Sequence, residues 1–360
     1  MEQSPVTKVQ RQSNFDILKI IAFIFVVILH YNNKSMGGAL AYSEGATFIF
    51  FSAFESLAIV AVPIFVLITG YFSRYSKTFN LKKIFGLYVM QFSYLAICYL
   101  LDVAIFKTEF SVTGFFSVFI PNNYFINFYA VLMLVAPLLN CIFKLNKKTI
   151  IGLMVALVTL FVLLPTAIDV IFELTGKTLP LGLSFVTMYG TFYGYSVVYF
   201  IVLYLIGACI REYDIHIRKL ITLPAYVVLT ALITLESLKL SAATHYDNVL
   251  VLASALSLFL LFKEIKIKEI KPIGFIAKCS LGVFLLHTTR LISYDYFGLF
   301  HIQENIEKGF GSAALNMLAV VFSTVAICVV ADILLRLAVT PIKKRLYKTK
   351  ILNYNIIEVE

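Results

Sequence analysis

Two histidines lie within apolar stretches of this sequence, where ionisable side chains are rare. His30 lies near the end of the apolar run 15–33, and His287 lies in the run 273–296. Because a titratable group is costly in hydrocarbon, each is a candidate for function. Histidine is the natural general base at neutral pH, and it could remove the proton of a sugar hydroxyl that attacks a thioester. This chemistry would be acyl transfer.

Two other interpretations apply to these histidines. His30 could be an interfacial residue that only hydrogen-bonds to its neighbours. The pair could also bind a metal ion, but no further Cys, Asp or Glu completes a ligand set around it. The sequence therefore favours catalysis and predicts no metal site.

Other ionisable residues accompany the histidines. Lys19 precedes His30 by eleven positions, which on a helix is about 16 Å along the axis; it is either a snorkelling anchor or functional. Glu55 lies inside the run 47–72, where it must pair, be protonated or face water. We expect solvent contact for the remaining acids and histidines near helix ends and in loops, which are Asp102, Asp169, His216, His245 and His301.

A basic cluster, Arg74, Lys77, Lys82 and Lys83, follows the run 47–72. The simpler interpretation is anchoring by the excess of positive charge found in cytoplasmic loops. The functional one is phosphate binding, because a nucleotide would need cations at a cytosolic entrance.

The elements that must position these residues are transmembrane helices. Hydrophobic residues make up 60% of the 360 positions and charged residues 14%, too little charge to cover a soluble protein of this length. The apolar runs have the length of membrane-spanning helices and not the alternation of barrel strands. We predict an all-α, polytopic integral membrane bundle of about ten spans, at 15–33, 47–72, 84–106, 124–143, 149–170, 192–210, 220–237, 247–262, 273–296 and 313–338.

The positive charges predict an orientation. Of the 30 Lys and Arg residues, 22 lie in alternate segments predicted to be inside and 5 in the outer ones, with the other three within spans. Both termini are therefore predicted to be cytoplasmic. Residues 1–340 are predicted to form one transmembrane domain, followed by a short basic cytosolic tail, 341–360. Because the basic residues lie in short loops without interleaved aromatics, the net charge of +10 does not indicate nucleic-acid binding.

Four segments in order resemble the membrane-bound acyltransferase 3 family. The first run resembles its opening motif, a basic residue eleven positions before a histidine, here Lys19 and His30. Residues 61–72 resemble its Val-Pro segment with a Ser-Gly-Tyr-like ending, and residues 123–140 resemble its Trp-Phe and Ser-Pro segment. Residues 280–287 match its Ser-x-Gly-x-Tyr-Leu-x-His signature. The chain departs from the family in having lysine at 19 instead of arginine, and Lys82-Lys83 instead of Arg-x-x-Arg.

The resemblance implies an O-acyltransferase of a bacterial cytoplasmic membrane. It would use acetyl-CoA or another acyl-CoA as co-substrate, without a tightly bound cofactor, and a surface polysaccharide or lipid-linked glycan as acceptor, with glycan-assembly machinery as a possible partner. His30 and His287 would be catalytic. The donor would bind at Lys19, Arg74, Lys82 and Lys83, and the pocket would be lined by Glu55, Tyr129, Ser280 and Arg290. The alternatives are a transporter or exporter of an oligosaccharide, for which no pair of interrupted repeats is visible, and a receptor-like or scaffolding protein. The oligomeric state is not legible from the sequence.

Overall fold

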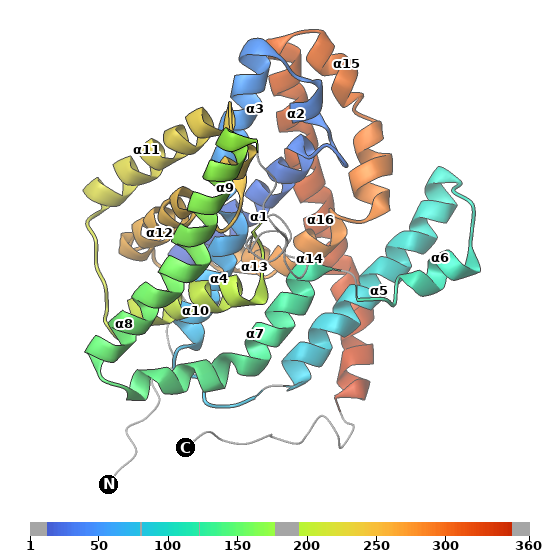
Figure 1. The fold of residues 1–360 in the computed structure, drawn as a ribbon. Helices are drawn as coiled ribbons and strands as arrows, with labels where there is room; N and C mark the ends of the chain where they lie inside the picture. Colours follow the sequence, from blue (N-terminus) through green and yellow to red (C-terminus); the bar gives the residue numbers. More distant parts are fainter. Residues whose placement is uncertain (1–12, 80, 122, 177–193, 348–360) are drawn as a thin grey trace.

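The computed structural model describes residues 13–79, 81–121, 123–176 and 194–347, and no β-strand occurs in these ranges (Figure 1). The α-helices are α1 Ser13–Asn32, α2 Ala39–Tyr42, α3 Gly45–Ala58, α4 Ala61–Ser73, α5 Leu81–Phe106, α6 Val112–Ser117, α7 Tyr124–Cys141, α8 Lys147–Val158, α9 Leu164–Thr175, α10 Val197–Glu212, α11 Lys219–Ser237, α12 Val249–Glu264, α13 Lys271–Ala277, α14 Ser280–Leu286, α15 Ile302–Glu307 and α16 Phe310–Leu346.

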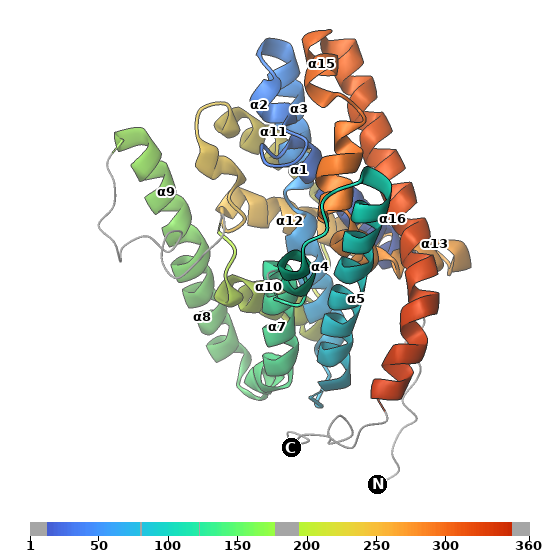
Figure 2. The same ribbon diagram turned by 90° about the vertical axis from the view of Figure 1, so that its right-hand side faces the viewer.

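Three helices form the centre of the bundle. Most side chains of α1, α4 and α10 are buried, and α4 packs against both of the others. Around them, α8, α9 and α11 lie on the left in Figure 1, and α5 and α6 lie on the right. Figure 2 shows α8 and α9 at one edge of the bundle and α16 toward the other. These outer helices expose many large apolar side chains, as expected of surfaces that face lipid.

The predicted all-α membrane fold is confirmed. Eight helical segments of the described chain are long and apolar enough to cross a membrane. The two other predicted spans have counterparts outside that group: 192–210 corresponds to α10, which has 16 residues, and 273–296 is divided between α13, α14 and a π-helical segment, Leu291–Tyr296. The count of ten spans and the orientation of the termini stay predictions.

Three predicted spans depart from the regular α-helix that the sequence suggested. Proline explains two of these irregularities, because it lacks the amide hydrogen for the helical bond and its ring crowds the preceding turn. Pro63 follows the break between α3 and α4, and Pro165 follows the π-helical segment Thr159–Leu163 between α8 and α9. The third irregularity, between α13 and α14, places His287 directly after a short helix.

Some sequence-based predictions fall on residues outside the described ranges. These are Lys8, Arg11, Lys177, Lys348 and Lys350, and the last part of the predicted tail 341–360. The first part of that tail is helical, because α16 continues through Pro341 to Leu346.

Candidate active site

The two histidines predicted to be catalytic lie side by side. His30 comes from the last turn of α1, and His287 caps α14. Their ring centroids are 4.5 Å apart with an interplanar angle of 33°. His287 is completely buried. The fold thus joins two residues that are 257 positions apart in the sequence.

The hydrogen bond of His287 fixes where its proton lies. Nδ1 is 2.6 Å from the carbonyl oxygen of Val283, one turn earlier. Because a carbonyl oxygen can only accept, Nδ1 must carry the hydrogen. A neutral ring then has its lone pair on Nε2, which is buried without a hydrogen-bond partner among the described residues. His287 is therefore held in the tautomer that a general base requires.

Glu55 lines the same cavity as His30 and is held by the end of α1. The side-chain amide of Asn32 donates to a carboxylate oxygen of Glu55 at 2.9 Å and to the carbonyl oxygen of Phe51 at 3.1 Å. Asn32 follows His30 by two positions, so this contact joins α3 to the helix end that carries the histidine. The sequence analysis overlooked Asn32, because a neutral amide in an apolar run gives no charge signal.

His30 and Glu55 line an outer cavity of about 570 Å³. Arg290 lines it as well, so the structure brings Glu55 and Arg290 to one cavity, and their role in binding stays a prediction. The cavity also contains two polar side chains that the sequence analysis did not select, Gln91 and Tyr246. Both polar atoms of Gln91 are buried without a hydrogen-bond partner in the described structure. An amide in that state is free to bind a hydroxyl group of a ligand.

Asp102 lines this outer cavity, where it is more enclosed than the sequence analysis expected of a residue near a helix end. Its side chain is buried, and one oxygen is 3.6 Å from Nε of Arg290. The helix α5 extends to Phe106, so its last turn places Asp102 within the fold. The expectation of solvent contact held for His216 and His301, whose side chains are 58% and 64% exposed.

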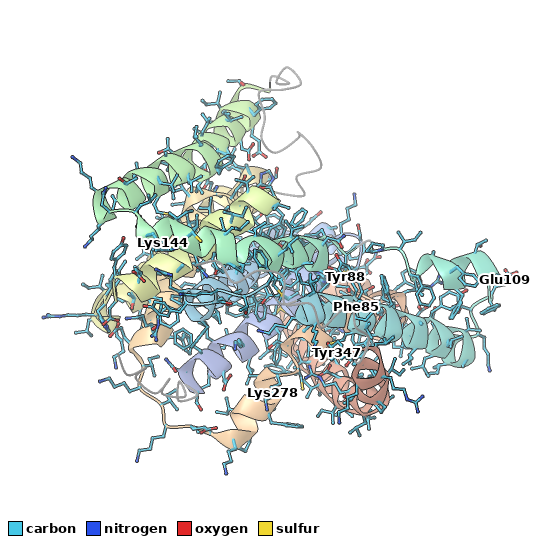
Figure 3. All side chains as sticks on the ribbon, turned by 90° about the horizontal axis from the view of Figure 1, so that it is seen from below. Phe85, Tyr88, Glu109, Lys144, Lys278 and Tyr347 are labelled. Carbon is cyan, nitrogen blue, oxygen red and sulfur yellow. The ribbon has the colours of Figure 1, made fainter. Side chains whose placement is uncertain are left out.

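An inner cavity of about 600 Å³ lies where α5 begins and α16 ends; we name it after the predicted orientation. Among the described residues that line it there is no carboxylate, and four are lysines from different segments: Lys19, Lys83, Lys278 and Lys343. Figure 3 shows this mouth from below, with Lys278 and Tyr347 on the same side of α5. Such a concentration of positive charge favours an anionic ligand.

The predicted donor-binding residues are divided by the fold. Lys19 and Lys83 line the inner cavity, and Lys82 is not among its lining residues. Neighbouring positions on a helix point about 100° apart, so only one of the two lysines faces the cavity. Arg74 lines a separate cavity of about 270 Å³, where it pairs with Glu212 at 2.9 Å.

Tyr129 and Ser280 also line the inner cavity. The sequence analysis grouped them with Glu55 and Arg290 in a single pocket, and the structure instead places the two pairs in different cavities. Tyr129 is held by a 3.1 Å hydrogen bond between its hydroxyl and that of Thr69. The correction follows from helix geometry, because α7 and α14 both pass from one cavity to the other.

A thin septum separates the two cavities. On each of three elements, consecutive residues line opposite cavities: Met90 and Gln91 on α5, Tyr124 and Phe125 on α7, Phe284 and Leu285 on α14. The rings of Phe125 and Phe284 are in contact, with centroids 4.5 Å apart. Phe284 also contacts His287, at a centroid distance of 5.9 Å. The septum, formed by Met90, Phe125 and Phe284, therefore lies against the histidine pair.

The position of α14 depends on a glycine. A Cβ atom added at Gly282 would overlap the carboxylate of Asp332 on α16. That carboxylate cannot easily move, because Tyr94 donates to it at 2.8 Å and Nε of Arg336 lies 2.7 Å from it. The glycine of the Ser-x-Gly segment is thus required for close packing of α14 on α16, one turn before His287.

Replacing Gly282 with alanine should therefore push α14 away from α16. We expect a loss of roughly 1–3 kcal/mol from overpacking, with a lower melting temperature and lower activity, because His287 moves with α14. Thermal unfolding in detergent measures the first, and acyl transfer, the activity that the sequence analysis predicts, measures the second. Gly152→Ala on α8 is the matched control, since its Cβ would meet open space. Equal effects of the two substitutions would contradict this account.

Comparison with known proteins gives one match. A family model described as "Acyltransferase domain" matches residues 12–336. No curated protein and no solved structure matches the chain. The match covers nearly the whole chain and includes both histidines, the septum and every residue that lines the two cavities except Lys343 and Tyr347. The chain therefore belongs to the acyltransferase domain family, as a multi-pass membrane acyltransferase.

Proposed function

We propose that the protein transfers an acyl group, most simply acetyl, from a cytosolic acyl-CoA to a hydroxyl group of a glycan outside the cytoplasmic membrane of a bacterium. The observation that carries this proposal is the pair of cavities that meet at the septum beside His30 and His287. Each cavity offers a different chemistry, one basic and one rich in hydrogen-bonding groups. A transporter without acyl-transfer activity would not account for the family membership.

The inner cavity suits the donor. Its lysines would bind the phosphates of CoA, and the pantetheine arm would extend toward the septum. Lys19 and His30 lie eleven residues apart on α1, or about 16 Å along the helix axis, which is a distance that an extended pantetheine arm can cover. The nucleotide would stay at the inner mouth while the thioester reaches the histidines.

The outer cavity suits the acceptor. Asp102, Glu55 and Gln91 can accept or donate hydrogen bonds to sugar hydroxyls, and Tyr246 offers a ring face. These groups fit a surface polysaccharide or a lipid-linked glycan. Glycan-assembly proteins would be the natural partners on this side.

The proposed reaction uses the histidines as acid and base. One imidazole nitrogen takes the proton of the acceptor hydroxyl, and the oxygen attacks the thioester carbon. The carbon–sulfur bond breaks, the thiolate of CoA leaves, and the imidazolium returns the proton to it. The fixed tautomer of His287 makes Nε2 a proton acceptor, but His287 lines neither cavity, so it would receive the proton by way of His30. His30, whose ring contacts it and lines the outer cavity, would position the hydroxyl or share the proton.

The proposal is tested by surface-glycan acylation in a deletion strain complemented with wild type, His30→Ala or His287→Ala. NMR of mild-alkali-labile esters identifies the acyl group. Loss on deletion, with rescue by wild type alone, is the expected result. This assay does not detect transfer to a small-molecule acceptor. Binding of acyl-CoA to the purified protein is therefore measured as well. An unchanged ester profile together with no acyl-CoA binding would disprove the proposal.

The two neighbouring lysines of α5 provide a sharp test of donor binding. Lys83→Ala should raise the KM for acyl-CoA about tenfold, because one charge-assisted contact to phosphate is lost, with a smaller effect on kcat. Lys82→Ala is the matched control, since it removes the same charge from a position outside the cavity lining. Steady-state transfer kinetics in proteoliposomes measure both. A larger rise for Lys82→Ala than for Lys83→Ala would contradict the assignment of the cavity.

A further inference from the structure

Three acidic and basic side chains meet on the outer part of the molecule, away from the histidine pair. They are Asp169 on α9, His245 just after the short 3-10 helix Ser241–Thr244, and Asp247 before α12. Each residue offers one atom that could coordinate a metal, and these three atoms lie within 4.8 Å of one another. His245 Nδ1 is 2.8 Å from Asp169 Oδ2. The side chains of His245 and Asp169 are only 18% and 12% exposed. The expectation that these two residues would be solvated is therefore wrong.

This cluster is held by one face of α9. Thr166, Asp169 and Glu173 have the spacing of a single helix face, and all three contact the segment 241–249. The hydroxyl of Thr166 accepts from the amide of Val249 at 2.9 Å, and Glu173 accepts from the amide of Ala242 at 3.0 Å. The positions of the three candidate ligands are thus set by backbone contacts on either side of them, as a preformed site requires.

The charges of the cluster are not balanced within the described structure. Asp247 is 6% exposed, and its Oδ1 is buried without a hydrogen-bond partner. No Lys or Arg of the described residues forms an ion pair with Asp169 or Asp247. Two carboxylates therefore share one imidazole. Burying such charges without a counter-ion is costly, and a cation bound between them would remove that cost.

A second histidine of this chain shows the balanced alternative. His216 also lies between two carboxylates, with Nε2 3.0 Å from Asp214 and Nδ1 2.6 Å from Glu264. There Lys263 supplies positive charge, with Nζ 3.4 Å from Asp214. The carboxylates also hold the pKa of His216 above its ordinary value, Glu264 contributing most. That group therefore needs no external cation, because a lysine lies beside its carboxylates and the side chains of His216 and Asp214 are 58% and 76% exposed.

We propose that Asp169, His245 and Asp247 bind a divalent transition-metal cation, Zn²⁺ or Mn²⁺, from the outer side. One imidazole nitrogen and two carboxylate oxygens are ligands that these ions accept, with water completing the coordination. The ion would take the place of the proton between His245 and Asp169. It would also neutralise the buried carboxylate of Asp247.

The cation would act on the acceptor cavity through Tyr246. This residue lies between two ligands in the sequence, lines the outer cavity, and stacks on Tyr195 with ring centroids 3.6 Å apart. Metal binding would therefore fix one wall of that cavity, and the ion itself would not contact the reacting atoms. This structural role is independent of the reaction proposed above, because it concerns binding and stability.

The test uses the full-length protein in detergent, stripped with a chelator and then dialysed against Zn²⁺ or Mn²⁺ with excess Mg²⁺. Elemental analysis should find about one bound metal ion per chain of the wild type. Either ion should raise the melting temperature of the protein. Asp247→Asn should lose both the bound metal and the thermal shift. His216→Ala is the matched control and should retain both.

Three results would overturn the proposal. They are a wild-type protein without bound metal or thermal shift, an Asp247→Asn protein that retains both, and a His216→Ala protein that loses both. If Asp247→Asn does not fold, His245→Gln provides the second variant. The metal content and melting temperature of the wild type also test the proposal without any variant. Because none of these measurements uses acyl transfer, failure of the metal site and failure of the proposed reaction are distinguishable.

Discussion

His30→Ala is expected to lower kcat for acyl transfer by about 10²- to 10⁴-fold, the usual range for loss of a positioned acid or base. His287→Ala should have an effect of the same order, because the two rings are in contact at 4.5 Å. The double variant should lose little more than either single one, since residues that act as a unit are not additive. Transfer from labelled acyl-CoA in proteoliposomes measures all three.

Two controls separate catalysis from folding. Binding of acyl-CoA should be retained in His30→Ala, because that side chain lines the outer cavity and not the inner one. His216→Ala removes an exposed histidine far from the pair in sequence and should leave kcat at the wild-type level. Wild-type kcat in well-expressed His30→Ala would exclude the catalytic role.

Arg336→Met should destabilise the bundle, because it leaves the buried carboxylate of Asp332 without its ion-pair partner; the loss should be smaller than the roughly 3–5 kcal/mol of a fully buried pair, since the Arg336 side chain is 38% exposed. Asp332 is completely buried, and Nε of Arg336 lies 2.7 Å from its carboxylate. The same guanidinium donates to the carbonyl oxygen of Lys278 at 2.5 Å, so it also holds one wall of the inner cavity. A large fall in melting temperature and a higher KM for acyl-CoA are expected together.

Two further variants test whether the charge of Arg336 and its position on α16 account for this effect. Arg336→Lys retains the charge and should recover part of the lost stability, although it loses the forked geometry. Arg345→Met removes an arginine from the exposed end of the same helix, α16, and should change the melting temperature little. Equal melting temperatures for Arg336→Met and Arg345→Met would show that the buried pair contributes nothing.

The parts of the site that the sequence predicted were those with a charge signal in an apolar run. His30 and His287 were recognised because titratable groups are rare there, and their similar depth followed from the helical rise. The bundle itself followed from hydropathy, because backbone groups in lipid must satisfy one another within helices. These inferences need no knowledge of how helices pack.

The parts that were not predicted depend on helix rotation and on neutral residues. Sequence gives no rotation of α5, so Lys82 and Lys83 looked equivalent, although only Lys83 lines the inner cavity. Gln91 and Asn32 carry no charge and were overlooked. Asp169 and His245 are 76 positions apart, and only tertiary packing brings them together.

The septum has a consequence for the energy metabolism of the cell. A membrane enzyme with a water-filled opening on each face would dissipate the proton gradient if the two openings joined. Met90, Phe125 and Phe284 interpose apolar side chains where consecutive residues face opposite openings, and apolar constrictions of this kind resist wetting and ion passage. The septum is only one layer of side chains, so the acyl group of the proposed reaction would cross a short distance between the two cavities. Under the proposed reaction, the protein would pass an acyl group between two compartments and keep them electrically insulated.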